Sequence, residues 1–287
     1  MCALRAGIQR VNITPPIGTP LGGYIARKGP SEGVHDELSA TALVLRDGKK
    51  ALILVSVDVI AIPSQMDWTI RGEVKKLTGV PEENILIAAT HTHSGPALLF
   101  GYQGQVGAAY RSFLTEAIVG CIEAAWKGTR PAACGVGEGS VQGLGVNRRA
   151  PEQGPCDPQV GVLRVDADEE VLGLVLNATC HPTVLGPDNL LISRDYPGYA
   201  VDVLEKTIGG RVIFTNGAAG DVNPGHSADL CALGLYTPGR TFAQAKRKGF
   251  MLAGEAMKVA VAIETFPSVP LEVHTRKLTL PLRPLPT

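Results

Sequence analysis

The chain has 287 residues, 45% of them hydrophobic and 19% charged, which is typical of a globular domain with a sizeable core. Lysine plus arginine and aspartate plus glutamate both number 27, and this zero net charge argues against a general nucleic-acid binder. The six cysteines form no C-x-x-C pair, no apolar run reaches membrane-spanning length, and the N-terminus lacks the apolar core of a signal peptide. We therefore expect a cytoplasmic protein without a transmembrane segment.

Apolar runs and helical patterns alternate along the chain. Continuous apolar runs predict buried strands at Ala51–Val57, Asn84–Thr90, Val171–Cys180 and Arg211–Asn216. Apolar residues at helical spacing predict helices at Gln65–Leu77, Val106–Trp126 (followed by Gly128 as a stop signal), Pro197–Thr207 and Thr241–Ile263. Other extended stretches could lengthen the sheet or add antiparallel pairs: Glu37–Leu45, Ala133–Gln142, Gln159–Val165 and Leu271–Leu282. This alternation predicts an α/β fold, a mixed and largely buried β-sheet flanked by helices on both faces.

We interpret residues 1–287 as a single domain. No fixed-period repeat or low-complexity tract divides the chain. Two Pro- and Gly-rich stretches, Thr14–Gly33 and Val146–Pro158, are predicted to be long loops, which are often functional. The strand-like segment Leu271–Leu282 is followed by only a few residues, and we expect the domain to be incomplete at its C-terminus.

The strongest candidate for a functional site is a pair of histidines. His91 and His93 directly follow the predicted strand Asn84–Thr90. Residues two apart in an extended chain face the same side, and ligands of open α/β sheets bind at the carboxyl ends of strands. Two neighbouring imidazoles suit a metal, or one metal ligand beside one proton carrier. The alternative is a pair of surface histidines at a turn.

A third histidine ends another predicted strand. His181 follows Val171–Cys180 and precedes Pro182, which ends the strand pairing. It could supply another imidazole to the same site, or be a histidine with a purely structural role. Adjacent strand residues face opposite sides, so we expect Cys180 in the core and not at the His181 site.

Further candidates lie in the loops. Small residues in Asn216–Pro224 allow close approach of the backbone to a ligand, although a tight turn explains the same pattern equally well. A nucleotide binder is the least favoured reading of this loop, because it has no phosphate-loop lysine. Asp58 could orient a histidine, or it could only cap a helix or turn. Arg148 could bind a carbonyl or carboxylate, or it could be a solvated loop charge. Asp195 could cap a helix.

Several motifs, in this order, resemble the neutral/alkaline non-lysosomal ceramidase family. They are V-N-I-T-P-P-I-G from Val11 with G-G-Y from Gly22, H-T-H-S-G-P from His91, N-R at Asn147, H-P-T at His181, I-S-R-D-Y-P-G-Y-A from Ile192 and G-D-V-N-P from Gly220.

The resemblance implies roles for particular residues. His91 and His181 would bind a catalytic zinc, His93 and Arg148 would contact the substrate beside it, and Gly220, Asp221 and Asn223 would line the substrate site. The family's remaining zinc ligands, a glutamate and a tyrosine, come from a later stretch that nothing in this chain matches; His226 and Asp221 are conceivable substitutes. Asn223 stands where the family carries serine, which places ceramide itself in doubt as the substrate.

The resemblance thus implies a zinc-dependent hydrolase that cleaves the N-acyl bond of a small-molecule or lipid amide, with a place in sphingolipid metabolism. Zinc would activate water for attack on the acyl carbon, His93 would stabilise the oxyanion or move the proton, and Arg148 would donate a hydrogen bond. Asp58 would set the tautomer of a histidine. Two alternatives remain: a zinc hydrolase of a different small amide or ester, and a non-catalytic binding relative.

Overall fold

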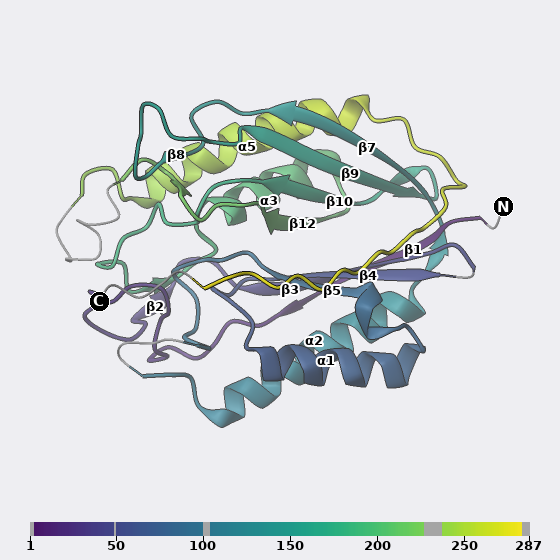
Figure 1. Ribbon diagram of the computed structural model, residues 1–287, viewed down its shortest axis with the longest axis horizontal. Coiled ribbons are helices and arrows are strands. Elements are labelled where there is room, and N and C mark those ends of the chain that lie inside the picture. The colour runs from purple at the N-terminus through teal and green to yellow at the C-terminus, as the bar shows by residue number, and fades with distance from the viewer. Residues whose placement is uncertain (1–2, 49, 100–103, 227–236, 283–287) are drawn as a thin grey trace.

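The computed structural model describes residues 3–48, 50–99, 104–226 and 237–282, and it shows four layers (Figure 1). Two β-sheets lie face to face, and a pair of helices covers the outer face of each sheet. No helix among the described residues is both long enough and apolar enough to cross a membrane.

The first sheet has the strand order β5-β4-β3-β1-β6. It is antiparallel except at one edge, where β4 and β5 run parallel. Helices α1 and α2 cover its outer face, and the core between them contains Val44, Ile53, Ile70 and Ile118. The elements are β1 (Arg5–Asn12), β3 (Ser39–Arg46), β4 (Ala51–Val57), α1 (Ser64–Thr78), the short 3-10 helix η1 (Glu82–Asn84), β5 (Ile85–Ala89), α2 (Ala108–Lys127) and β6 (Arg130–Pro131).

The second sheet has the order β12-β10-β9-β7 and likewise contains one parallel pair, β10 with β12. Helices α3 and α5 cover it, and this core contains Leu176, Tyr196, Phe214 and Leu252. The elements are β7 (Ala133–Ser140), β9 (Gln159–Ala167), β10 (Glu170–Ala178), α3 (Asp195–Ile208), β12 (Arg211–Asn216) and α5 (Phe242–Ala262). The side chain of Thr241 caps α5 by accepting a hydrogen bond from the Gln244 amide.

A third core lies between the two sheets and explains why their strands are continuously apolar. In β3, Ala42 and Val44 face the helices, whereas Leu43 and Leu45 face the other sheet. Two small ladders join loops at one end of the layers. They are β2 (Gly33–Val34) with β11 (Leu191–Ile192), and β8 (Val146–Asn147) with β13 (Val222–Asn223).

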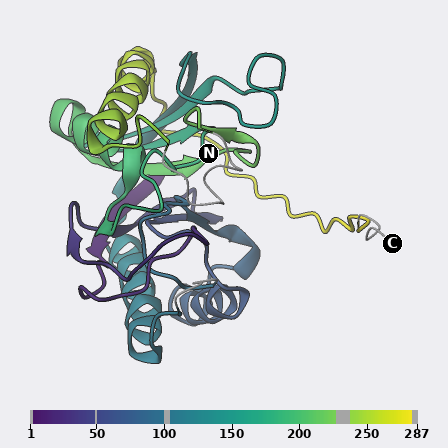
Figure 2. The same ribbon diagram turned by 90° about the vertical axis from the view of Figure 1, so that its left-hand side faces the viewer.

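The predicted α/β class, with helices on both outer faces, is confirmed. The structure differs from the prediction because the strands form two sheets instead of one, and because β1 was not anticipated. The segment Leu271–Leu282 forms no strand, so that expectation was wrong: Leu271 packs against the core between the sheets, and Leu278 and Leu280 are exposed. Figure 2 shows this segment running away from the layers.

Candidate metal centre

Two histidines from the two sheets meet at the same end of the molecule. His91 follows β5 and His181 follows β10, each at the carboxyl end of a strand that has a parallel neighbour. Their Nε2 atoms lie 3.1 Å apart. This separation suits two ligands of one tetrahedral zinc ion, because two nitrogens about 2.0–2.1 Å from the same zinc lie roughly 3.3 Å apart.

Backbone carbonyls fix the tautomers of both histidines. The Nδ1 atom of His91 lies 2.6 Å from the Ile60 carbonyl oxygen, and that of His181 lies 2.6 Å from the Ala219 carbonyl oxygen. A carbonyl oxygen only accepts hydrogen bonds, so both Nδ1 atoms carry the proton. In the neutral rings, both Nε2 atoms then present lone pairs to each other. That contact is unfavourable unless a cation lies between them, so the donor set fits a metal ion.

His93 completes a group of three imidazoles. One ligand atom from each of His91, His93 and His181 lies within 4.8 Å of the other two. The ring centroid of His93 is 5.0 Å from that of His91 and 5.6 Å from that of His181. Both of its ring nitrogens are buried and have no hydrogen-bond partner among the described residues. Such an unsatisfied buried imidazole points to a missing ligand or substrate.

Burial keeps His93 neutral. Desolvation, and then the neighbouring His91 and His181, hold the pKa of His93 well below its usual value. Desolvation also lowers the pKa of His181. Neutral imidazoles are the protonation state that binds metals and accepts protons.

The backbone, and not strand alternation, brings His91 and His93 together. Strand β5 ends at Ala89, and His91 has a left-handed φ of 69°, which is uncommon for a residue other than glycine. The His91 amide donates to the Val59 carbonyl and helps to hold this conformation. The expected proximity is confirmed, but the reason given for it was wrong. Backbone strain of this kind is concentrated at functional sites.

A second loop lies between His181 and Arg148. The amide of His181 donates to the Val222 carbonyl over 2.8 Å, and the amide of Arg148 donates to the Asp221 carbonyl over 2.7 Å. The pairing of β8 with β13 holds this arrangement. The guanidinium of Arg148 is partly exposed and lies 3.9 Å from the Asp221 carboxylate. The loop therefore holds the backbone of Arg148 next to Asp221, one residue from the contact with His181.

Gly220 borders an open hollow of about 560 Å³, together with Asp221 and Arg149. A Cβ atom on Gly220 would meet nothing within 4 Å, so this glycine is not required by crowding within the protein. None of His91, His93 and His181 is among the described residues that line this hollow, so the predicted substrate role of Gly220 stays a prediction.

Two predicted site residues are engaged elsewhere. The Asp58 carboxylate accepts hydrogen bonds from the amide and hydroxyl groups of Ser39, over 2.8 and 2.9 Å, so the predicted orienting role is wrong. Burial raises the pKa of Asp58. The side-chain amide of Asn223 donates to the His226 carbonyl and accepts from the Gly225 amide, so it stabilises its own turn.

Three other expectations can be compared with the structure. Neither His226 nor Asp221 belongs to the group of metal-ligating side chains found among the described residues. Asp195 does not cap α3: the capping position is Arg194, and the Asp195 carboxylate accepts from the Leu185 and Tyr196 amides. Cys180 is fully buried in the second core, as expected.

Sequence reasoning missed the residues that support His93. The Tyr24 ring lies 4.9 Å from the His93 ring. Gly23, with a φ of 100°, packs so closely that a Cβ atom there would lie 2.5 Å from His93 Nδ1. Arg27 donates to the His93 carbonyl oxygen. The motif match included Gly23 and Tyr24 without assigning them a role, and the signal for Arg27 was its position within the long loop Thr14–Gly33.

Comparisons with known proteins identify relatives of this chain. The neutral ceramidase of Mycobacterium tuberculosis is 28% identical over an alignment of 262 residues, which covers 79% of this chain and 41% of that protein. The neutral ceramidase of Pseudomonas aeruginosa is 29% identical over 247 residues, covering 77% of this chain and 37% of that protein. The chain thus spans about two fifths of the length of these curated relatives.

A solved structure described as "Ceramidase complexed with C2" superposes with a TM-score of 0.78 at 25% identity, over 91% of this chain and 44% of that one. The neutral ceramidase structure from Pseudomonas aeruginosa, at 24% identity and a TM-score of 0.76, shows the same fold. The family model for the N-terminal part of neutral/alkaline non-lysosomal ceramidase matches residues 4–234. The chain therefore belongs to the neutral/alkaline non-lysosomal ceramidase family.

Proposed function

We propose that this chain forms the histidine-bearing part of a zinc-dependent hydrolase that cleaves an N-acyl amide bond. His91 and His181 would hold the metal. The observation that carries the proposal is the pair of Nε2 atoms, 3.1 Å apart and both without a proton, because their Nδ1 atoms donate to carbonyls. Family membership supports amide hydrolysis as the reaction.

Zinc supplies two things that an amide requires: it polarises the carbonyl and lowers the pKa of bound water to about 7. His93 is neutral, buried and close to both ligands, so we assign it contact with the reacting acyl group and transfer of a proton. The backbone of Arg148 pairs with the loop that also contacts His181, and its guanidinium would donate a hydrogen bond to the substrate. Gly220 and Asp221 would border the bound substrate.

The relatives are named for ceramide, but the loop after β12 differs here from the family motif. Asn223 stands in place of the family serine, and its amide is engaged with the backbone of its own turn. We therefore expect shorter N-acyl amides to be better substrates than long-chain ceramide. A small ester would be accepted by the same group of residues, because ester cleavage needs the same attack on an acyl carbon.

Metal analysis and turnover of the full-length gene product test the proposal together. We expect about one zinc per chain, hydrolysis of short N-acyl amides, and little hydrolysis of a fluorescent long-chain ceramide. Stoichiometric zinc without turnover of any amide or ester would indicate a non-catalytic binding relative. Robust ceramide turnover would show that the family serine is dispensable.

A further inference from the structure

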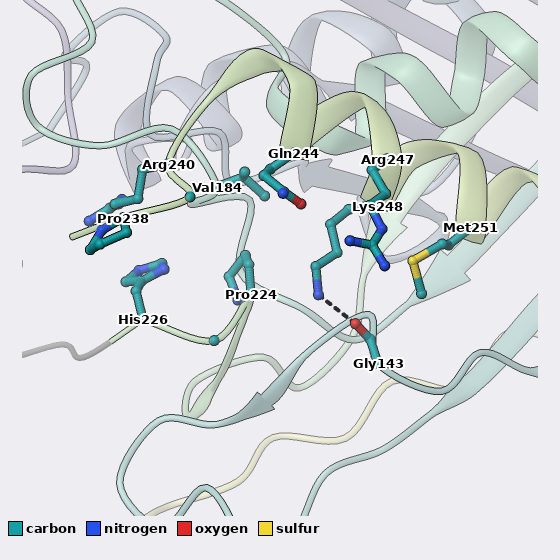
Figure 3. A pocket seen from close by; sticks show the side chains of 12 residues that line it. Gly143, Val184, Pro224, His226, Pro238, Arg240, Gln244, Arg247, Lys248 and Met251 are labelled. Atoms are coloured by element: carbon teal, nitrogen blue, oxygen red, sulfur yellow. Dashed lines mark hydrogen bonds between the residues drawn. The ribbon is translucent and has the colours of Figure 1, made fainter.

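A basic pocket lies next to the histidine group. It has a volume of about 380 Å³ and is lined by the cationic residues Arg240, Arg247 and Lys248, with His226 on the opposite wall (Figure 3). No aspartate or glutamate is among the described residues that line it. Pockets of this size accommodate small ligands.

Arg240 joins this pocket to the site of the proposed reaction. Its guanidinium donates to the carbonyl oxygen of Thr183, two residues after His181, over 3.0 Å. It also donates to the Tyr24 hydroxyl over 2.7 Å, and the Tyr24 ring packs against His93. A molecule bound in the pocket would therefore lie beside the histidines.

Arg240 also lies near a carboxylate, so we do not assign it the ligand. A Cβ atom on Gly186 would lie 2.4 Å from the Asp188 carboxylate and 3.2 Å from Arg240 Nε. The binding role falls instead to two side chains of α5.

Arg247 and Lys248 project from one face of α5, together with Gln244 and Met251. This spacing of three and four residues places all four side chains on the same side of the helix. Arg247 is exposed and forms no ion pair with any described residue. Both basic residues lie beyond residues 4–234, the region that the family model matches, so the family match does not account for them.

Lys248 is held in place with a donor to spare. It donates to the carbonyl oxygens of Gly143 and Leu144, the latter over 2.9 Å. An ammonium group has three donors, so one remains for a ligand. Burial lowers the pKa of Lys248; Cys180 acts in the opposite direction, and Arg247 lowers this pKa by a smaller amount. Arg247 and Lys248 thus gather positive charge in a pocket whose described lining contains no carboxylate. An anion would relieve this unbalanced charge.

We propose that this pocket binds an oxyanion group, a carboxylate or a phosphate, carried by the substrate of the neighbouring site. That the oxyanion belongs to a substrate rests on the proposed function, whereas binding of the oxyanion itself does not depend on it. A guanidinium and an ammonium group side by side match the oxygens of such a group. A hydrocarbon chain would need an apolar lining, and three cations in this pocket oppose one.

Direct binding of inorganic phosphate tests the pocket without any catalysis. We expect saturable binding by calorimetry, weakened about tenfold or more in Arg247→Gln, since a charge-assisted hydrogen bond is lost. Lys246→Gln is the matched control, because Lys246 belongs to the same helix but lies against Phe250 and not in the pocket. Phosphate affinity that is undetectable, or equal in Arg247→Gln and wild type, would overturn the proposal.

Matched substrates separate the two sources of the oxyanion. We expect an N-acyl amino acid or an N-acylaminoalkyl phosphate to show kcat/KM about tenfold above that of the neutral N-acyl amino acid amide. The charged substrate with the higher kcat/KM identifies the preferred oxyanion as a carboxylate or a phosphate. Arg247→Gln should reduce the ratio of kcat/KM between the charged and the neutral substrate. Equal kcat/KM for charged and neutral substrates would overturn the pocket's role while leaving the proposed function intact. Phosphate binding without hydrolysis of any substrate would instead overturn the proposed function alone.

Discussion

In the first sheet, the loop after β4 holds the histidine that follows β5, through the Ile60 carbonyl; in the second, the loop after β12 holds the histidine that follows β10, through the Ala219 carbonyl. Each histidine is thus oriented by the loop of its strand's parallel neighbour. The half of the molecule that contains the first sheet and the half that contains the second sheet differ in their other site features. The first half adds a left-handed backbone at His91 and a His93 whose buried ring nitrogens have no hydrogen-bond partner among the described residues, whereas the second adds the Arg148 loop and the basic pocket. In the proposed site, metal binding would be shared between the halves, whereas proton transfer and recognition of substrate charge would each belong to one half.

Removing either metal ligand should have the largest effect and the same effect in both halves. We expect His91→Ala and His181→Ala each to weaken zinc binding by at least about 100-fold, because each ligand is part of the binding free energy. Competition with a chromophoric chelator measures the affinity. His274→Ala, an exposed histidine outside the group, is the control and should bind zinc as the wild type does. Wild-type affinity in either ligand variant would contradict the shared site.

His93 should behave differently from its two neighbours. We expect His93→Ala to retain zinc but to lose about 10²–10⁴ in kcat, because a positioned proton carrier is removed. The two measurements are chelator competition and turnover of a short N-acyl amide. Loss of zinc as severe as in His91→Ala would make His93 a third ligand, and an unchanged kcat would remove it from the reaction.

Each half also contains a buried carboxylate, Asp58 in the first and Asp195 in the second. Burial raises the pKa of Asp195 to about 6. The folded state then holds a proton that the unfolded state releases near pH 4, so stability falls as pH rises from about 4 to about 6. The decrease is at most about 3 kcal/mol, from about two pKa units at 1.36 kcal/mol each.

Urea unfolding across this pH range measures the effect of Asp195. The difference between wild type and Asp195→Asn isolates it, and the wild-type protein should lose stability relative to the variant as pH rises. A relative gain on the same path would show that the backbone hydrogen bonds to this carboxylate outweigh its burial.

The smallest effect is expected at Asp58, the carboxylate of the first half. Asp58→Ala should destabilise the protein by about 1–3 kcal/mol, because the amide and hydroxyl of Ser39 lose their buried acceptor. Zinc affinity should stay at the wild-type value, since carbonyls orient the histidines. A fall in affinity comparable to that of His91→Ala would restore the orienting role for Asp58.

The sequence indicated the principal site residues because strand ends are recognisable from apolar runs. Those runs placed His91 and His181 at the carboxyl ends of buried strands, and the motif match assigned them to a metal. The sequence could not show that the strands divide into two sheets, because a run buried between helices and a run buried between a helix and a second sheet have the same composition.

Other features of the site were hidden for physical reasons. Every residue has a carbonyl, so no residue type marked Ile60 or Ala219 as the group that orients a histidine. A left-handed φ at His91 has no signature in a residue other than glycine. The basic pocket combines α5 with loops distant in sequence, and helical spacing alone does not distinguish Arg247 and Lys248 from other charges on the predicted helix Thr241–Ile263.

The separation of His91 and His181 along the chain has a thermodynamic consequence. A cation held by both would cross-link positions 90 residues apart and from opposite sheets. Because the unfolded chain lacks this closed loop, the metal would stabilise only the folded form, by about 4 kcal/mol at a thousandfold excess over its Kd. The midpoint of thermal unfolding would then follow the free zinc concentration, and chelation would lower it.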